Sequence, residues 1–230
     1  MSKIKILALE GLDGSGKSTQ IDLLRAFFSK NKIKFKYLHF PVTDSEPYGE
    51  LVARFLRGEF GDVGSVHPQL VALLFALNRS EFYGVLTGAE FENGVILLDR
   101  YVYSNIAFQC SKLLTVEGKI RLQNWILNFE FDFLKLPKPD LCLFLDVPSD
   151  FMKQNLSLVR MGESRSYLNG QRDIHEASVN LQESVAREYS RLVQDVDGIK
   201  RIECYNANGI LSREEIHAKI VDTIGMALLR

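Results

Sequence analysis

The chain has 230 residues, a net charge of −1, and an ordinary balance of 46% hydrophobic and 25% charged residues. These values indicate one globular domain, residues 1–230, with at most a small insertion. Because the charge is almost neutral, we expect no nucleic-acid partner and no membrane partner, and any anion site must be built locally.

The three cysteines are widely spaced and form no C-x-x-C pair, which favours packing in the core under reducing conditions. The four histidines show no metal-ligand spacing. The N-terminus runs directly into a predicted strand, which leaves no room for a signal peptide, and the longest apolar run, 70–77, is too short to span a bilayer. We therefore expect a cytoplasmic protein.

Predicted strands and helices alternate along the chain. We expect strands over 4–9, 35–40, 95–98, 141–147 and 201–205. We expect helices over 20–30, 48–57, 68–92, 103–112, 116–134, 149–160, 174–196 and 212–228. Apolar strands that alternate with helices indicate a five-stranded parallel sheet covered on both faces, which is a three-layer α/β/α fold.

The predicted helix over 116–134 carries an apolar stripe. Its members are Leu122, Trp125, Ile126, Phe129 and Phe133. This spacing is typical of a buried helix face, so we interpret Trp125 as a core residue rather than as part of a binding site.

Residues 11–19 read GLDGSGKST and match the phosphate-binding P-loop pattern G-x-x-x-x-G-K-[ST], between a predicted strand and a predicted helix. Glycines at Gly11, Gly14 and Gly16 let backbone N–H groups approach phosphate oxygens, and the helix N-terminus adds its positive dipole end. Lys17 would contact the β- and γ-phosphates of a nucleotide, and Ser18 would bind Mg²⁺. The expected ATP-binding residues here are Gly11, Leu12, Asp13, Gly14, Ser15, Gly16, Lys17, Ser18 and Thr19. The alternative is a chance match in a glycine-rich turn.

Other polar residues follow the carboxyl ends of predicted strands, where open α/β sheets bind ligands. Phe40 and Pro41 follow one strand, and Asp99 and Arg100 follow another. Asp99 suits an Mg²⁺ site, directly or through water, and Arg100 can donate a planar fork of hydrogen bonds to phosphate. The alternative is a surface ion pair at a strand end.

Two weaker signals complete the predicted site. Phe75 and Arg79 lie four residues apart on one helix face, where an aromatic ring and a guanidinium suit a flat heterocycle, although Phe75 could equally be a core residue.

Residues 161–171 lack apolar periodicity and lie close to Arg160, Arg165 and Arg172. We interpret about 160–173 as a flexible lid that closes over ATP, with a solvated loop as the alternative.

Together these motifs resemble the thymidylate kinase family of P-loop nucleoside-monophosphate kinases, over nearly the whole chain. The residues that carry the resemblance are the P-loop of 10–20 with Asp13, Phe40-Pro41, Leu74-Phe75 with Asn78-Arg79, LLDRYVYSNIAFQ at 97–109, and PKPDL at 137–141. The resemblance implies Mg²⁺-dependent phosphoryl transfer from ATP to dTMP, which gives dTDP and ADP on the way to dTTP. Alternatives are a kinase for another nucleoside monophosphate or nucleoside, and a non-catalytic nucleotide-binding regulatory protein.

The resemblance also implies residue roles. Phe75 would stack on thymine, Arg79 would bond to the base beside Ser104 and Asn105, and Asp13 would reach the sugar 3′-hydroxyl near Phe108. Arg100 would hold the acceptor phosphate. The implied substrate-binding residues are Asp13, Phe40, Pro41, Leu56, Phe75, Arg79, Arg100, Ser104, Asn105 and Phe108. The implied catalytic residues are Lys17, Arg100, Asp13, Arg160 and Arg165, with Arg172 at ATP, and Ser18 and Asp99 at the metal.

Two local features qualify this resemblance. Ser15 stands where one family variant has a P-loop arginine, so the catalytic arginines would come from the lid, and Asp173 to Glu176 would position that lid or contact the purine. His39 stands where the family usually has an arginine that binds the monophosphate, so either Arg54 or Arg57 replaces it or binding is weaker. The family also suggests a homodimer that uses apolar helix faces around 51–56, 70–77 and the segment after Ser104.

Overall fold

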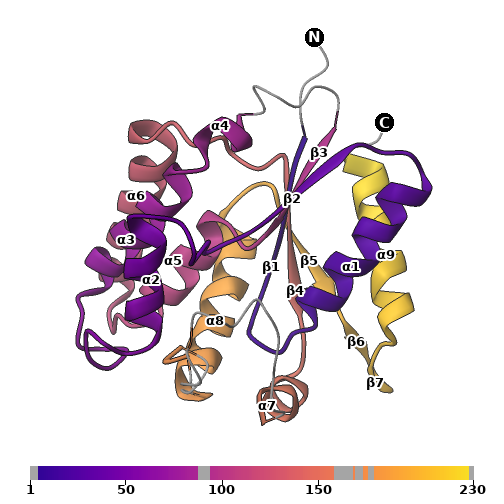
Figure 1. Ribbon diagram of the computed structural model, residues 1–230. Helices are drawn as coiled ribbons and strands as arrows, with labels where there is room; N and C mark the ends of the chain where they lie inside the picture. The colour runs from indigo at the N-terminus through magenta and orange to yellow at the C-terminus, as the bar shows by residue number, and fades with distance from the viewer. Residues whose placement is uncertain (1–4, 88–93, 158–167, 169–172, 176–178, 228–230) are drawn as a thin grey trace.

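The computed structural model describes residues 5–87, 94–157, 168, 173–175 and 179–227. Its centre is a five-stranded sheet in which all strands run parallel, in the order β2-β3-β1-β4-β5 (Figure 1). The strands are β1 (Lys5–Gly11), β2 (Phe35–His39), β3 (Val95–Asp99), β4 (Leu141–Asp146) and β5 (Ile199–Glu203). The predicted sheet is therefore confirmed.

Helices cover both faces of this sheet. Figure 1 shows α1 (Lys17–Lys30) and α9 (Arg213–Ala227) on one side. The other side carries α2 (Tyr48–Leu56), α3 (Pro68–Ser80), α5 (Val102–Cys110), α6 (Val116–Leu127) and α8 (Val179–Asp195). The short helices α4 (Tyr83–Leu86) and α7 (Ser149–Ser157) lie at the ends of the molecule. Within the described ranges, no helix is long and apolar enough to cross a membrane.

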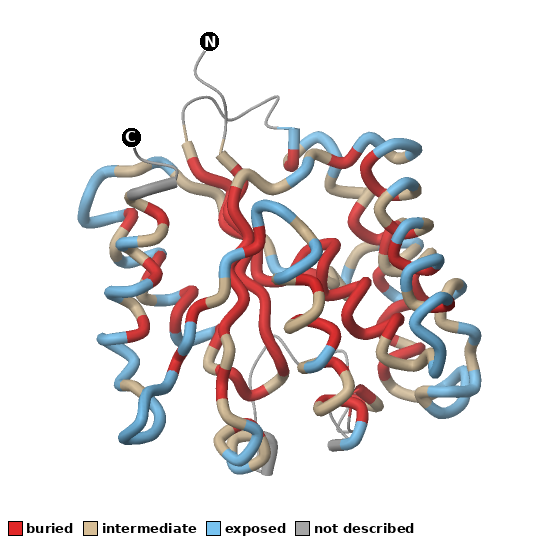
Figure 2. Tube along the Cα trace, turned by 180° about the vertical axis from the view of Figure 1, so that it is seen from behind, coloured by how far each residue is buried: buried red, intermediate tan, exposed pale blue. Residues whose placement is uncertain are grey.

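The central strands are buried because helices cover them on both faces. All five residues of β3 are buried, whereas the edge strand β2 is half-buried or exposed along its length (Figure 2). Continuous apolar sequence is what a parallel strand with two covered faces requires. The three cysteines are buried free thiols, as their spacing predicted.

A second, smaller apolar cluster lies away from the sheet, between α2 and α3. Its buried members are Val52, Phe55, Leu56 and Val71, and Phe75 and Ile174 pack against it. Ile174 belongs to the segment 173–175 that precedes α8, so this cluster joins α2 and α3 to the end of the predicted lid.

Two predicted helices are too long. The helix predicted over 68–92 ends at Ser80, because the Asn78 side chain bonds to Val42 and Ser45, and the ring of Phe82 packs on Phe40 at 5.8 Å. The helix predicted from 174 does not include 174–175, which form a turn, and α8 is described over Val179–Asp195. Before it, the Asp173 carboxylate accepts the N–H of His175, which makes a turn instead of a helix.

The last strand is displaced from its prediction, and a small hairpin follows it. Strand β5 ends at Glu203, two residues before the predicted end. The next residues form an antiparallel pair that was not predicted, β6 (Tyr205–Asn206) and β7 (Gly209–Ile210). Gly209 adopts a φ of 113°, which a glycine tolerates easily, so this pair closes a tight turn.

The helix predicted over 116–134 changes type at its end. Helix α6 stops at Leu127 and continues as a π-helical segment, η1 (Asn128–Phe133), in which Leu134 N donates to Phe129 O. The wider turn shifts which residues face inward, so Glu130 is fully buried and Phe133 is 74% exposed. The predicted stripe is therefore wrong at Phe133, and Trp125 stacks on Phe129 with ring centroids 5.1 Å apart.

Candidate active site

The P-loop joins β1 to α1 as a tight turn. Gly16 caps α1 in the left-handed region, with φ 85° and ψ 13°, which other residues adopt at a cost. A Cβ atom on Gly11 would lie 2.7 Å from Ser15 Oγ, so the turn closes only without that side chain. The backbone is therefore free to approach a ligand at the N-terminus of α1.

Lys17 is the first residue of α1, and its side chain folds back over the loop. Its Nζ donates to Gly11 O at 3.1 Å and to Leu12 O at 2.8 Å. Burial lowers the pKa of Lys17 to about 8, and the nearby Arg100 acts in the same direction. The ammonium is thus held inside the P-loop, with backbone carbonyls as its partners.

Arg100 follows β3 and reaches the same loop. Its backbone has a φ of 66°, an uncommon value for a residue with a side chain, and such strain is typical of functional sites. Its Nη1 donates to Gly11 O at 3.0 Å, its Nη2 pairs with the Asp13 carboxylate, and its guanidinium lies 5.2 Å from the Phe108 ring centroid. The structure therefore brings Lys17, Arg100 and Asp13 together.

Opposite charges keep Arg100 and Asp13 in their ionised forms. Burial by itself would lower the pKa of Arg100, but the Asp13 carboxylate, together with Tyr189, Asp99 and Glu10, outweighs burial and the pKa is raised. Burial by itself would raise the pKa of Asp13, but Arg100 and Lys17 hold it well below its ordinary value.

Asp99, at the end of β3, offers a free carboxylate oxygen. Its Oδ2 lies 3.2 Å from His39 Nδ1, whereas its buried Oδ1 has no hydrogen-bond partner among the described residues. Burial would raise its pKa, but the His39 bond and other cations lower it, so the carboxylate is ionised. Ser18, the second residue of α1, is exposed. Oxygen ligands of this kind fit Mg²⁺.

The cations near the predicted monophosphate site already have partners. His39 contacts Asp99, Arg54 Nε lies 2.8 Å from Glu59, and Arg57 Nε lies 2.6 Å from the same carboxylate. Neither arginine is singled out as the replacement for the family's usual arginine.

Glu10 is a site residue that the motif did not identify. It is fully buried, its Oε1 accepts the N–H groups of Tyr101 (2.9 Å) and Ser104 (3.2 Å), and its Oε2 accepts the hydroxyl of Tyr189 at 2.9 Å. It therefore anchors the start of α5 to the P-loop strand. The Ser104 hydroxyl itself donates to Tyr101 O at 2.9 Å.

Gln182 on α8 is a second residue that no sequence pattern signalled. Its Nε2 donates to Asp13 Oδ2 at 2.8 Å and to His175 O at 3.1 Å, and its Oε1 accepts the N–H of Asp13 at 3.3 Å. One glutamine thus connects the P-loop to the segment 173–175.

Two aromatic residues predicted for the nucleoside, Phe75 and Phe108, pack around His175 together with Phe55, which was not predicted. The His175 ring is stacked at 5.0 Å on Phe108 and at 6.4 Å on Phe75, and Phe55 meets it edge-on at 5.5 Å. Burial, followed by the nearby Lys112, holds the pKa of His175 well below its ordinary value, so the ring is neutral. The adjacent Ile174 N donates to Leu56 O at 3.0 Å. The structure thus places this segment among the predicted acceptor residues.

Arg79 and Asn105 also meet, through a carboxylate that was not predicted. Arg79 is 1% exposed, and its Nε and Nη2 lie 2.7 and 2.5 Å from the oxygens of Glu130. Asn105 Nδ2 donates to the same carboxylate at 3.0 Å. The only signal in the sequence was an acidic residue beside an apolar stripe.

The remaining predicted residues have simpler surroundings. Phe40 is 1% exposed and packs on Tyr101 at 6.2 Å, so its side chain belongs to the core, whereas Pro41 is half-buried. Thr19 is exposed. The lid arginines Arg160, Arg165 and Arg172 lie outside the described residues.

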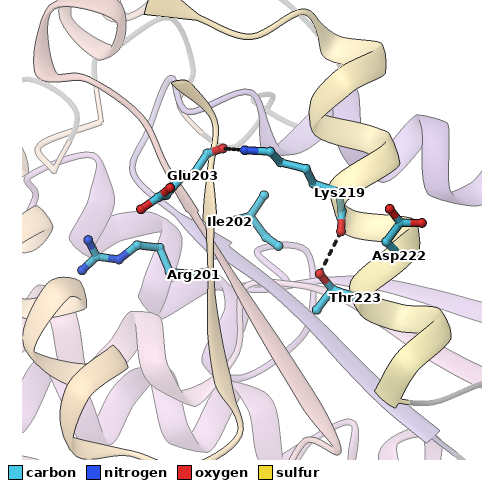
Figure 3. Close-up of a pocket in the computed structure, with 6 residues that line it drawn as sticks. All are labelled: Arg201, Ile202, Glu203, Lys219, Asp222 and Thr223. Atoms are coloured by element: carbon cyan, nitrogen blue, oxygen red, sulfur yellow. Dashed lines mark hydrogen bonds between the residues drawn. The ribbon is translucent and has the colours of Figure 1, made fainter. Parts of the chain in front are cut away.

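A pocket elsewhere on the molecule contains none of these residues. It lies between β5 and α9, where Ile202 faces the helix and Lys219 Nζ donates to Glu203 O at 2.8 Å (Figure 3). The other lining residues are Arg201, Asp222 and Thr223. This pocket is separate from the P-loop site.

We expect Glu10→Gln to change how stability depends on pH. Burial, only partly offset by Arg100, raises the pKa of Glu10 from 4.5 to about 7. Between these two pH values the folded wild type keeps a proton that the unfolded chain releases, so the wild type loses stability as the pH rises. The variant does not lose stability in this way. Its free energy of unfolding, relative to wild type, should therefore rise across that range by up to roughly 3 kcal/mol in urea titrations. A difference that stays constant with pH would contradict this role of Glu10.

Known proteins are similar to this chain in sequence and in fold. Residues 9–220 match the family model described as thymidylate kinase. The probable thymidylate kinase of Pyrococcus horikoshii is 32% identical over 225 residues, which cover 97% of each chain. The thymidylate kinase of Mycobacterium tuberculosis is 31% identical over 188 residues, which cover 81% of this chain and 85% of that protein.

A solved structure agrees with these sequence matches. The thymidylate kinase from Candida albicans superposes with a TM-score of 0.71 at 25% identity, over 98% of this chain and 93% of that one. The family model covers most of the chain, and the relatives share the phosphate-transfer class of activity that the P-loop indicates. The chain therefore belongs to the thymidylate kinase family of phosphotransferases.

Proposed function

We propose that the chain transfers the γ-phosphoryl group of ATP to dTMP and releases dTDP and ADP, a step that supplies dTTP. One observation carries this proposal: Lys17 Nζ and Arg100 Nη1 both point at the carbonyl oxygen of Gly11, at 3.1 and 3.0 Å. Two cations from the donor-side and acceptor-side motifs thus converge on one point. Phosphoryl transfer needs this arrangement, because negative charge is shared between donor and acceptor oxygens.

On the donor side, the N–H groups of the P-loop and the N-terminus of α1 would bind the ATP phosphates. Lys17 would exchange the carbonyls of Gly11 and Leu12 for phosphate oxygens. Ser18 and Asp99 would hold Mg²⁺, which supplies further neutralisation of phosphate charge when it is bound. Arg160, Arg165 and Arg172 remain the predicted lid arginines, because Ser15 gives the P-loop no arginine of its own.

On the acceptor side, Arg100 would bind the dTMP phosphate, and the Asp13 carboxylate would accept a hydrogen bond from the 3′-hydroxyl of the sugar. Phe75 and Phe108 would flank the nucleoside. The His175 ring stands between them, with ring centroids 5.0 Å from Phe108 and 6.4 Å from Phe75. A base that stacks on Phe75 from this side would therefore displace the His175 ring.

The chemical step needs no strong general base, because the acceptor oxygen is already anionic. Catalysis would rest on the alignment of the two phosphates and on charge neutralisation by Lys17 and Arg100. Enclosure of the site before transfer would limit hydrolysis of ATP by water.

The test of this function is ADP release from MgATP with dTMP, compared with dUMP, dGMP, CMP, UMP, thymidine and no acceptor. We expect selective turnover with dTMP. Selective turnover with another acceptor would retain phosphoryl transfer but discard the thymine assignment of Phe75 and Arg79. Nucleotide binding without turnover on any acceptor would instead indicate a regulatory protein.

We expect Lys17→Ala and Arg100→Ala each to lower kcat by roughly 100-fold or more, because each removes a cation that faces the transferring phosphoryl group. Steady-state ADP release measures the effect. The matched control is Lys219→Ala, which removes a lysine of α9 that lines the separate pocket and should leave kcat unchanged. Wild-type turnover in a folded Lys17→Ala protein would rule out the proposed role.

We also propose a homodimer through apolar helix faces around 51–56, 70–77 and the segment after Ser104. Leu70 on α3 is 60% exposed and Ile120 on α6 is 46% exposed, which leaves apolar surface for a partner. Sedimentation at micromolar concentration should give the mass of a dimer, and Leu70→Lys should shift it towards monomer. A wild type that sediments as a monomer would contradict the proposal.

We place the reaction in the cytoplasm. The support is that all three cysteines are free thiols, each buried in the described structure, as expected for a protein that folds under reducing conditions. Fractionation of cells that express the tagged chain would test this, and recovery outside the cytoplasm would contradict it.

A further inference from the structure

Glu130 is a buried carboxylate that accepts hydrogen bonds from two residues assigned to the base. It is 0% exposed and receives Nε and Nη2 of Arg79 and Nδ2 of Asn105. Arg79 comes from α3, Asn105 from α5 and Glu130 from η1. The carboxylate therefore holds three helical segments in one arrangement.

These contacts decide which way the Asn105 amide points. Its Nδ2 lies 3.0 Å from Ala72 O and 3.0 Å from Glu130 Oε1, and both of these atoms can only accept from it. The NH₂ group must therefore face them, and Oδ1 must face the other way. Asn105 Oδ1 is buried and has no hydrogen-bond partner among the described residues. A buried acceptor without a partner is unfavourable unless a ligand supplies a donor.

Glu130 fixes Arg79 in the same way. Two bonds to one carboxylate hold the planar guanidinium in a single orientation. A guanidinium has five N–H groups, so Arg79 keeps further donors that the carboxylate does not use. The result is a fixed acceptor, Asn105 Oδ1, and a fixed donor group, Arg79, both bound to Glu130.

The backbone around Glu130 is also unusual. Glu130 lies within the π-helical η1, and π-helical turns are rare and occur frequently at functional sites. In this turn Glu130 points inward while the nearby Phe133 is 74% exposed. The irregular turn is therefore what directs the carboxylate to Arg79 and Asn105.

We propose that Glu130 is a positioning residue for base selection. By orienting Asn105 and Arg79, it favours a pyrimidine that carries an N–H beside a carbonyl, as thymine and uracil do. Cytosine offers a bare ring nitrogen beside an amino group, so it would place acceptor against acceptor and donor against donor. This inference rests on the proposed function, which assigns Asn105 and Arg79 to the base.

The test compares dTMP with dCMP as acceptors for wild type and Glu130→Gln. The substituted glutamine keeps the shape of the side chain but puts an NH₂ group where the carboxylate has only acceptors. Arg79, which bonds to both oxygens, loses one bond in either orientation of the amide, and Asn105 loses its bond as well when the NH₂ group replaces Oε1. We expect the ratio of kcat/KM for dTMP over dCMP to fall by about tenfold or more, with KM for ATP unchanged. Calorimetric binding of dTMP and dCMP should show the same loss of preference without any need for turnover.

The matched control is Glu188→Gln. Glu188 is likewise buried, at 3% exposure, and bonds to two cations, Lys119 at 2.7 Å and Arg191 at 3.1 Å, but none of these residues contacts the predicted base site. This variant should keep the wild-type ratio. A similar fall in the control would show a general effect of a lost buried charge and would overturn the specific role of Glu130.

If thermal melting shows that Glu130→Gln does not fold, Glu130→Asp decides the question. The shorter aspartate keeps the charge for Arg79 but lacks the methylene group that it needs to hold Asn105 as well, so the same ratio should fall. A folded variant that keeps the wild-type ratio would overturn the proposal. If the wild type neither phosphorylates nor binds dTMP, the proposed function itself is contradicted. Failure of the proposed function can therefore be told apart from failure of the role of Glu130.

Discussion

The site depends on one buried cluster of charges around the carbonyl oxygen of Gly11. Lys17 and Arg100 both donate to that oxygen, and the Asp13 carboxylate balances Arg100. Two cations this close repel each other, and burial strengthens the repulsion. The carboxylates of Asp13 and Asp99 make the arrangement stable, and each stands at the end of a strand or in the loop that follows one. A ligand with negative oxygens could take over the bonds that the carbonyls now receive.

Part of this cluster could be predicted because its members lie in short, contiguous patterns. The P-loop and the Asp99-Arg100 pair each follow an apolar strand, and the ends of parallel strands meet at one edge of a sheet. Gln182 and Glu130 could not be predicted, because their contacts with Asp13 and Arg79 join residues that are 169 and 51 positions apart. A glutamine or glutamate in a helix carries no local sign of such a partner.

The same distinction explains the fold. Strands β1, β3 and β4 were predictable because continuous apolar sequence has few other stable arrangements. The end of α3 and the turn at 173–175 were not, because side chains bond there to distant or irregular backbone, as Asn78 does with Val42 and Asp173 does with His175. The small hairpin of β6 and β7 has too few residues to produce a period in the sequence. Local pattern therefore determined the layers, and tertiary contacts determined the boundaries.

The π-helical turn of η1 has a consequence for how the chain can vary in length. A π turn behaves as an α-helix with one residue added, so the segment between α6 and β4 contains one residue more than a regular helix would use. Substitutions on its outer side, such as at Phe133, which is 74% exposed, mainly meet solvent. Removal of a single residue between α6 and Glu130, at 128 or 129, would restore regular helical phase and rotate Glu130 away from Arg79. On the outer side of this segment, the number of residues is constrained more tightly than their identity.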